Sequence, residues 1–260
     1  MTTLSNKVIV VTGAGAGIGL GILQQVVAAG ATAVGFDLNA KSADKITQAG
    51  GHFVQVNVAD LDAFDAALHS VRDTHGQLDG LVNNAGVTIN VPFLEMTREQ
   101  METIWTVNHR SVLAGSQMAA RIMAADGTKG AIVQIGSNHA RCTNPGFEAY
   151  AGSKGAISSM VRAMAWSLGP HGIRVNALCP GLTMTEVVVD AAKDPENAKM
   201  FNSWHATGDV NSVADVGNAA VFLLSDHAAS ITGTEIIADR GMSSLLGVRD
   251  ARIRKDDADS

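Results

Sequence analysis

The chain has 260 residues, 46% of them hydrophobic and 17% charged, a composition that excludes a disordered chain and suffices for one large buried core. Its formal charge of -6 argues against a nucleic-acid partner, which favours a basic surface. No stretch approaches the roughly 20 apolar residues that cross a bilayer, and the N-terminus lacks a signal-peptide pattern. Two distant cysteines and unclustered histidines indicate neither disulfides nor a metal site. We therefore expect a cytoplasmic protein that binds no nucleic acid, no membrane and no metal.

Short β-branched segments alternate with helical patterns along the chain. Strands are predicted at residues 7–12, 32–37, 52–56, 78–83, 131–137, 174–179 and 234–239. Helices are predicted at residues 17–29, 60–75, 97–125, 148–169 and 212–225. Several of the strands are apolar throughout, which is typical of a parallel sheet covered on both faces. The order predicts an α/β fold, a single Rossmann-like, doubly wound parallel sheet flanked by helices on both faces.

The pattern predicts one dinucleotide-binding and catalytic domain over residues 1–248, followed by a charged tail at 249–260. The segment at about 182–207 breaks the alternation, and we expect it to form a substrate loop over the carboxyl edge of the sheet, where such folds bind ligands. We expect the tail to be a solvated end, with contact to a neighbouring subunit's pocket as the alternative.

A glycine-rich turn, TGAGAGIG at residues 12–19, joins the first strand to the first helix. Its glycines follow G-x-x-x-G-x-G at Gly13, Gly17 and Gly19 rather than the strict G-x-G-x-x-G. Residues without a Cβ let the backbone turn tightly and approach a pyrophosphate, and the helix N-terminus supplies N–H groups for the phosphates. The turn therefore predicts dinucleotide binding, and a glycine turn without a ligand is the alternative.

The second strand ends at Asp37, about 20 residues after the glycine turn. A carboxylate there can accept hydrogen bonds from the adenosine ribose of NAD and would repel the 2′-phosphate of NADP. No lysine or arginine follows Asp37 until Lys41. These residues predict NAD as the cofactor. A role for Asp37 in capping the next helix is the alternative.

Tyr150 and Lys154 stand four residues apart at the start of a predicted helix, so both side chains lie on one helix face. We expect the ammonium group to lower the pKa of the phenol from about 10, so that the tyrosine can exchange a proton with a substrate hydroxyl. Tyr150 is the only tyrosine in the chain, which argues against a mere packing role.

Together, these motifs resemble the short-chain dehydrogenase/reductase family over almost the whole chain. The resemblance rests on residues 12–19, Asp37, Asp60, 83–86, Asn108, Ser137, Tyr150, Lys154, Pro180, Gly181 and Thr185. One departure is visible after the last strand, where the family commonly has Asp-Gly-Gly and this chain has Asp239, Arg240 and Gly241. Arginine tolerates a left-handed backbone less well than glycine, so we expect the turn or a nearby subunit contact to differ.

The resemblance implies a catalytic set of Asn108, Ser137, Tyr150 and Lys154. Ser137 would hydrogen-bond the reacting oxygen, Lys154 would also hold the nicotinamide ribose, and Asn108 would keep a water that links Lys154 to solvent. The implied cofactor residues are Gly13, Gly15, Ala16, Gly17, Ile18, Gly19, Asp37, Leu38, Val58, Asp60, Asn84, Ala85, Gly86, Tyr150, Lys154, Pro180, Gly181, Thr183 and Thr185. Local alternatives are a surface amide for Asn108, a strand-end cap for Ser137, and a plain turn for residues 83–84. The family also implies a homo-oligomer, a tetramer or dimer.

The stretches expected around Tyr150 are polar, including residues 138–144, so we expect a polyhydroxylated small molecule rather than an apolar one. The predicted activity is oxidation of a sugar or polyol hydroxyl, with a sulfonated or carboxylated aldose as one form. The predicted substrate contacts are Ser137, His139, Arg141 and Tyr150, and Arg141 could pair with an anionic group; a rim or interface position is the alternative for His139 and Arg141. The alternative activities are a 3-oxoacyl or other carbonyl reductase and a hydroxysteroid dehydrogenase. A dinucleotide-sensing regulator would have lost the Tyr/Lys/Ser set, which is intact here.

Overall fold

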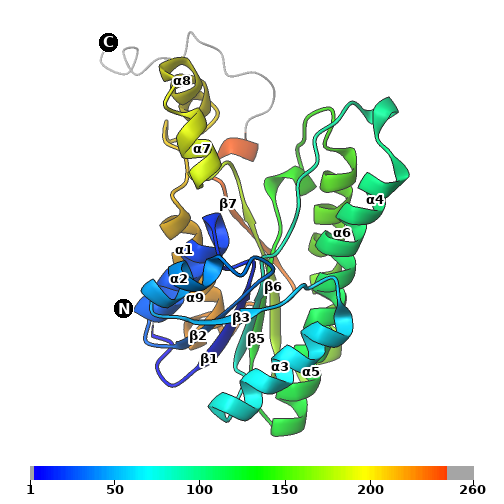
Figure 1. The fold of residues 1–260 in the computed structure, drawn as a ribbon, viewed down its shortest axis with the longest axis vertical. Coiled ribbons are helices and arrows are strands. Elements are labelled where there is room, and N and C mark those ends of the chain that lie inside the picture. The colour runs from blue at the N-terminus through cyan, green and yellow to red at the C-terminus, as the bar shows by residue number, and fades with distance from the viewer. Residues whose placement is uncertain (1–2, 245–260) are drawn as a thin grey trace.

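The computed structural model describes residues 3–244, which form one seven-stranded parallel sheet (Figure 1). In chain order the strands are β1 (Val8–Thr12), β2 (Thr32–Asp37), β3 (His52–Gln55), β4 (Gly80–Asn83), β5 (Ala131–Ile135), β6 (Arg174–Pro180) and β7 (Glu235–Ala238). Across the sheet they run β3-β2-β1-β4-β5-β6-β7, and every neighbouring pair is parallel. The predicted fold class is confirmed.

Helices cover both faces of the sheet (Figure 1). One face carries α1 (Gly17–Ala28), α2 (Ser42–Gln48) and α9 (Val213–Leu224). The other face carries α3 (Leu61–His75), α5 (Ser111–Asp126) and α6 (Glu148–Leu168), with α4 (Arg98–Trp105) leading into α5. Within residues 3–244, no helix combines the length and the apolar character that a bilayer crossing requires.

The apolar strands follow from these two helical layers. Successive strand residues point to opposite faces, so Val8 and Val10 enter the core under α3, α5 and α6, whereas Ile9 and Val11 enter the core under α1 and α9. All five residues of β1 are buried for this reason. A strand with water on one face would instead alternate apolar with polar residues.

Local sequence signals begin and end several helices. The Asp60 carboxylate accepts a hydrogen bond from Ala63 N at 3.1 Å and caps α3, which ends at Gly76 with a φ of 80°. Ser212 and Asp215 form a reciprocal capping box at the start of α9. These contacts explain why the predicted ends of both helices agree with the structure to within about two residues.

The predicted helix at 97–125 is interrupted by a π-helical turn at Thr106–Arg110, which separates α4 from α5. The helix α2 was not predicted. The segment at 182–207 is not an irregular loop but holds two short helices, α7 (Glu186–Ala191) and α8 (Pro195–Ser203), the second capped by Asp194. The predicted tail at 249–260 lies outside the described residues.

Arg240 does occupy the left-handed region that the family's glycine suggests, with a φ of 51°. Its guanidinium donates to the Asp215 carboxylate of α9 at 2.7 Å, and its carbonyl accepts from Ala206 N at 3.0 Å. The turn therefore keeps a glycine-like backbone, and the arginine side chain adds a link to α9.

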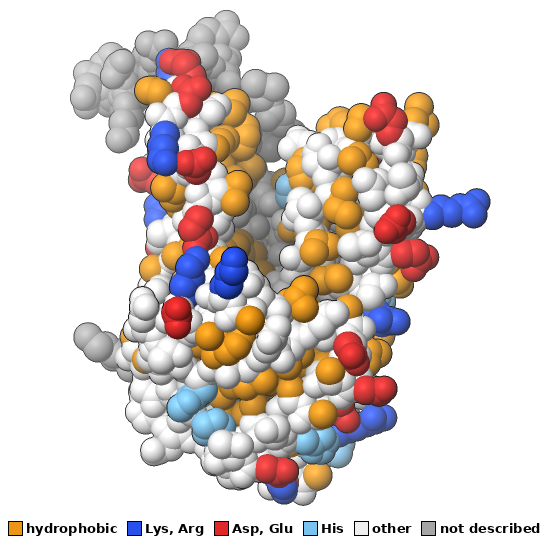
Figure 2. Space-filling view, in the orientation of Figure 1, with side chains coloured by type: hydrophobic (Ala, Val, Ile, Leu, Met, Phe, Trp, Pro, Cys, Tyr) orange, Lys and Arg blue, Asp and Glu red, His pale blue; other side chains and the backbone are white. Residues whose placement is uncertain are grey.

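Because the sheet is parallel, the segments that leave β1, β4, β5 and β6 all emerge at one edge. The strand order reverses between β1 and β4, which creates a crevice at that edge. Figure 2 shows a cleft above it, between the arm formed by α7 and α8 and the arm that includes α4 and α6, with hydrophobic side chains on both arms.

Candidate active site

The glycine turn after β1 lies too close to its neighbours to carry side chains. Gly13 and Gly17 have φ angles of 62° and 53°, in the left-handed region. A Cβ on Gly13 would lie 2.9 Å from the Cα of Ala85, and one on Gly17 would lie 3.1 Å from Thr185 Cγ2. The turn thus brings bare backbone next to the segments that follow β4 and β6.

Thr12 and Asn84 fasten this turn to the end of β4. The Asn84 amide donates to Thr12 O at 2.9 Å and to Gly13 O at 3.1 Å. The Thr12 hydroxyl accepts from the backbone N–H groups of Asn84 and Ala85, both at 3.0 Å. Residues 83–84 are therefore more than a plain turn. Thr12 was missing from the predicted site, although a hydroxyl at the end of the strand before the glycines was a usable signal.

The Asp37 carboxylate holds the turn from the other side. Its Oδ2 accepts from Gly15 N at 2.8 Å, and its Oδ1 accepts from Asn39 N at 2.9 Å. The helix α2 begins only after Lys41, so the alternative that Asp37 caps this helix is wrong. A carboxylate has about four acceptor positions, so lone pairs remain for ribose hydroxyls. Leu38 beside it is 64% exposed.

These residues fit a dinucleotide. The helix α1 begins at Gly17; its N-cap residue, Ala16, provides no side-chain cap, and no acidic residue lies in the first turn, so no residue of α1 itself neutralises the positive N-terminus. The glycines admit a close approach of phosphates, and Asp37 stands beside the turn. Val58 is buried, and Asp60 is engaged in capping α3.

Three of the four predicted catalytic residues, Ser137, Tyr150 and Lys154, line one small pocket of about 150 Å³. Its walls come from five segments: the start of α1, the segment after β4, the end of β5, the start of α6 and the end of β6. The lining residues are Ile18, Asn84, Gly86, Thr88, Ile135, Gly136, Ser137, Tyr150, Lys154, Pro180 and Gly181. Several residues predicted to bind the cofactor and three predicted to act in catalysis thus line a single pocket at the carboxyl edge of the sheet.

Burial raises the pKa of Tyr150 above its ordinary value, and hydrogen bonds with Ser137 and Thr88 lower it only in part. The expectation that Lys154 lowers this pKa is wrong in this structure. The lysine Nζ lies 5.7 Å from the centroid of the tyrosine ring and donates to Ile135 O at 2.8 Å. The ammonium is therefore close to the ring face, and its hydrogen bond goes to the backbone of β5.

Lys154 is itself buried, and burial lowers its pKa to about 8. Its ammonium group has left water for a site where one backbone carbonyl is the acceptor. At neutral pH the lysine thus remains mainly protonated, but its proton is held much less tightly than in solution.

Asn108 lies in the π-helical turn and is fully buried, so the alternative of a surface amide is wrong. Its side chain accepts from Val87 N and donates to Val87 O, both at 2.8 Å, and also donates to Ser153 Oγ at 3.3 Å. It therefore fixes the segment that carries Thr88 beside Tyr150. A π-helical turn in a long helix is frequently found at a functional site. The water that Asn108 would hold stays a prediction.

Ser137 and His139 lie beside Tyr150. The Ser137 hydroxyl accepts from His139 N at 3.1 Å, so it caps the turn after β5 as well as bonding to the tyrosine. The His139 ring packs edge-on against the Tyr150 ring at a centroid distance of 5.5 Å, and burial lowers its pKa. Phe147 packs against both rings.

Arg141 has a different partner. Its Nε donates to Glu235 Oε2 at 3.1 Å, and Arg162 of α6 donates to the other oxygen of the same carboxylate at 3.5 Å. Arg141 does not belong to the pocket around Tyr150. Glu235 was not singled out in the sequence, because β7 and the segment after β5 meet only in the folded sheet.

The segment after β6 borders the glycine turn. Gly181 N donates to Ala238 O at 3.2 Å, and the buried Thr183 donates from its hydroxyl to Gly181 O at 3.0 Å. Thr185 then lies against Gly17. Thr185, which was predicted to bind the cofactor, is thus brought to the glycine turn. Glu186, the next residue, was not predicted as a cofactor residue, but it also contacts the glycine turn.

Comparison with known proteins places this architecture in a family. Residues 13–243 match the family model described as enoyl-(acyl carrier protein) reductase. The chain is 38% identical over 233 residues to carbonyl reductase (NADPH) 2 of Sus scrofa, covering 89% of this chain and 94% of that protein. It is 37% identical over 240 residues to L-xylulose reductase of Homo sapiens, covering 92% and 97%.

Its fold is also similar to the solved structure of a short-chain type dehydrogenase/reductase from Mycobacterium ulcerans. The TM-score is 0.88 at 29% identity, covering 94% of this chain and 92% of the other. The chain belongs to the short-chain dehydrogenase/reductase family. It is therefore an oxidoreductase, and the pocket that joins Ser137, Tyr150 and Lys154 to the glycine turn is its candidate active site.

Titration of the only tyrosine tests the electrostatics of this dehydrogenase/reductase site. We expect the phenolate absorbance of the wild type to report a pKa above about 10, because burial disfavours the charged form. Ser137→Ala removes a hydrogen bond that lowers the pKa and should raise it further. Lys154→Met, the control, should leave it nearly unchanged. A wild-type pKa well below 10 that rises in Lys154→Met would instead show that the Lys154 ammonium lowers the pKa of Tyr150.

A second prediction concerns stability. Between pH 8 and about 10.5 the unfolded chain keeps the Lys154 proton that the folded chain has lost, so the free energy of unfolding rises with pH in this window, by about 3 kcal/mol from this group. Lys154→Met lacks the titrating group and should therefore lack this rise. Tyr150 titrates in both proteins, so its contribution cancels when one pH profile is subtracted from the other. Urea unfolding of both proteins across the window measures it. Parallel pH profiles would show that Lys154 keeps its ordinary pKa.

Proposed function

We propose that this oxidoreductase uses NAD to oxidise a hydroxyl group of a sugar or polyol, with Tyr150 as the acid/base residue. The observation that carries the proposal is the shared pocket in which Ser137, Tyr150 and Lys154 adjoin the glycine turn. A carbonyl reductase or hydroxysteroid dehydrogenase of the same family is the alternative.

The bound nicotinamide supplies hydride acceptance, and the protein supplies position and proton transfer. Ser137 and Tyr150 present two hydroxyls to the substrate oxygen, and Tyr150 takes up the proton when that oxygen becomes a carbonyl. Because burial raises the pKa of Tyr150, its phenol is mainly neutral near pH 7. Oxidation should therefore quicken as the pH rises and phenolate forms, whereas the neutral phenol suits the reverse reduction.

The NAD preference rests on Asp37. The carboxylate stands at the end of β2 with its backbone partners already fixed, so a 2′-phosphate near it would meet a held negative charge. One relative, carbonyl reductase (NADPH) 2, carries the other cofactor in its name. We therefore base the proposed preference of this chain for NAD over NADP on its own Asp37 and not on the relatives.

Cofactor kinetics test this part of the proposal. We expect kcat/KM to be about fivefold or more higher with NAD than with NADP, because two like charges a few ångströms apart repel by about 1 kcal/mol or more. Asp37→Ser should narrow the gap, mainly by improving NADP. Asp44→Asn, which removes a charge from the first turn of α2, is the matched control and should change neither. A wild-type preference for NADP would overturn the assignment.

A neutral polyol fits the pocket better than an acidic sugar. Thr88, Ser137 and Tyr150, which all carry hydroxyl groups, line the pocket, and the His139 ring packs edge-on against the tyrosine ring. Arg141, the cation expected to bind an anionic group, is engaged by Glu235. The name of L-xylulose reductase shows that a relative acts on a sugar. We therefore place neutral sugars and polyols first and acidic aldoses second.

A substrate screen tests this choice. With NAD, we expect turnover of neutral pentitols and aldoses, lower turnover of carboxylated and sulfonated sugars, and little effect of Arg141→Ala on the neutral compounds. Tyr150→Phe should lower kcat by about 10²–10⁴ while the protein stays folded, because it removes the proton-transfer group. Activity confined to apolar secondary alcohols would contradict the sugar proposal and favour the hydroxysteroid alternative.

The proposal includes a homo-oligomer in the cytoplasm. Large apolar side chains of α4, α5 and α6 remain exposed in the single chain, namely Trp105, Leu113 and Trp166, the last at 88%. Helical surfaces of this kind are commonly covered by another subunit. Both cysteines are free thiols, which suits a reducing compartment.

A further inference from the structure

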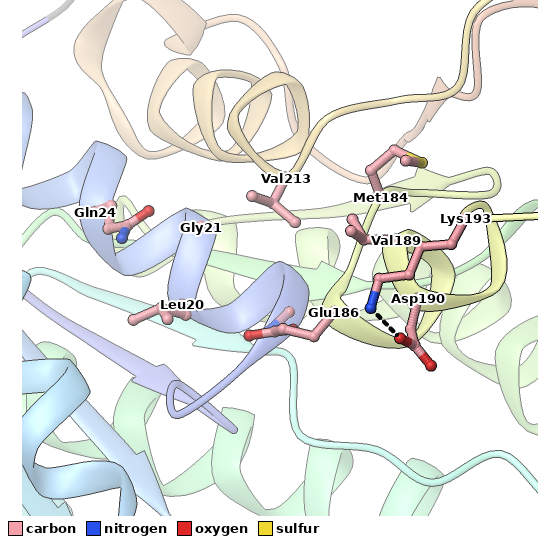
Figure 3. Close-up of a pocket in the computed structure, with 10 residues that line it drawn as sticks. Leu20, Gly21, Gln24, Met184, Glu186, Val189, Asp190, Lys193 and Val213 are labelled. Atoms are coloured by element: carbon pink, nitrogen blue, oxygen red, sulfur yellow. Dashed lines mark hydrogen bonds and ion pairs between the residues drawn. The ribbon is translucent and has the colours of Figure 1, made fainter.

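A carboxylate from a distant helix contacts the glycine turn. Gly17 N donates to Glu186 Oε2 at 3.0 Å, although the two residues are 169 positions apart in the chain. Figure 3 shows the Glu186 side chain reaching from the start of α7 toward the first turn of α1. Because α1 has no cap of its own, Glu186 supplies the negative group that its N-terminus favours.

The contact is weak enough to be exchanged. Glu186 and its other partner, Lys45, are both more than half exposed, and their charged atoms are 4.0 Å apart. Exposed ion pairs of this kind contribute little, and the Gly17 hydrogen bond is open to water as well. A phosphate oxygen, with more charge and more acceptor positions, can replace the carboxylate at the same N–H group.

The helix that carries Glu186 is lightly packed. We call residues 184–205 the lid; its helices α7 and α8 contain no buried residue. The lid is tied down at its ends, where Met184 N donates to Asn211 O at 2.8 Å and the following Ala206 N donates to Arg240 O at 3.0 Å. Segments with few buried contacts and fixed ends move at low free-energy cost.

A hollow of about 390 Å³ separates α7 from α1, so the lid has room to shift (Figure 3). Apolar and charged side chains line it together, including Leu20, Val189 and Lys193. Within the lid, Lys193 pairs with Asp190 at 2.7 Å, and both side chains are exposed. The Glu186 contact therefore bridges a gap that packing does not fill.

We propose that Glu186 is a gate on the phosphate-binding turn, closed in the free enzyme and released when a dinucleotide binds. The inference rests on the proposed dinucleotide function of the turn. The Gly17 N–H can donate to either the Glu186 carboxylate or a phosphate oxygen, so the carboxylate must leave the N–H before the dinucleotide can bind there. The apparent affinity for the dinucleotide is then the intrinsic affinity multiplied by the fraction of molecules in which Glu186 has left the turn. Glu186 thus sets dinucleotide affinity and links the position of the lid to the cofactor site.

Calorimetric titration with NAD tests the gate. Glu186→Gln should bind NAD about two- to fivefold more tightly than the wild type, the size expected for one charge at a helix N-terminus. Glu196→Gln removes the same charge from the other lid helix and is the matched control, with unchanged affinity expected. Glu186→Asp keeps the charge but shortens the reach, and it should also tighten binding.

Tryptophan fluorescence gives a second readout that needs no turnover. Trp204 follows α8 and is partly exposed, so Trp105→Phe with Trp166→Phe leaves one reporter at the lid. NAD should change its spectrum in the otherwise wild-type background. With Glu186→Gln added, the spectrum of the NAD-free protein should already lie closer to the NAD-bound one.

The outcomes separate the two hypotheses. Unchanged or weaker NAD binding by a folded Glu186→Gln protein, or a tightening matched by Glu196→Gln, would overturn the gate. A Trp204 spectrum insensitive to both NAD and Glu186 would overturn the lid movement. A wild type that binds neither NAD nor NADP would instead overturn the proposed dinucleotide function.

Discussion

The hydrogen bonds between Thr12 and Asn84 are the constraint on which the site depends. They join the end of β1 to the end of β4 at the point where the strand order reverses, so the glycine turn and the segment that carries Thr88 keep one relative position. Asn108 fixes the far side of that segment through Val87. The places proposed for phosphate binding and for proton transfer are thereby joined through the ends of two adjacent strands of the sheet.

Burial dominates the electrostatics of Tyr150 and Lys154, the proposed catalytic pair. It raises the pKa of Tyr150 and lowers that of Lys154, so both groups favour their neutral forms more than they do in water. The lysine hydrogen-bonds to the backbone of β5, and the hydroxyl of Ser137 bonds to the tyrosine. Ser137 and Thr88 are therefore the direct partners of the phenol, and Lys154 is a more distant neighbour.

Most of the fold and of the glycine turn could be predicted because their signals are local. Apolar runs such as residues 8–11 reflect burial on both faces of a parallel sheet, and Asp60 and Ser212 mark helix starts by capping them. The glycines of the turn require no distant information either, since backbone freedom belongs to the residue itself. The pairing of Tyr150 with Lys154 on one helix face followed from their spacing alone.

The sequence by itself therefore determined the parallel sheet, the glycine turn and the choice of Ser137, Tyr150 and Lys154 as candidate catalytic residues. Only the tertiary structure decided what each charged side chain contacts. Arg141 pairs with Glu235, 94 positions away, and Glu186 reaches Gly17, 169 positions away. The pKa of Tyr150 likewise depends on burial by segments from across the sheet. Such contacts and burial arise when distant segments meet, and no local pattern of residues encodes which partners will then be near.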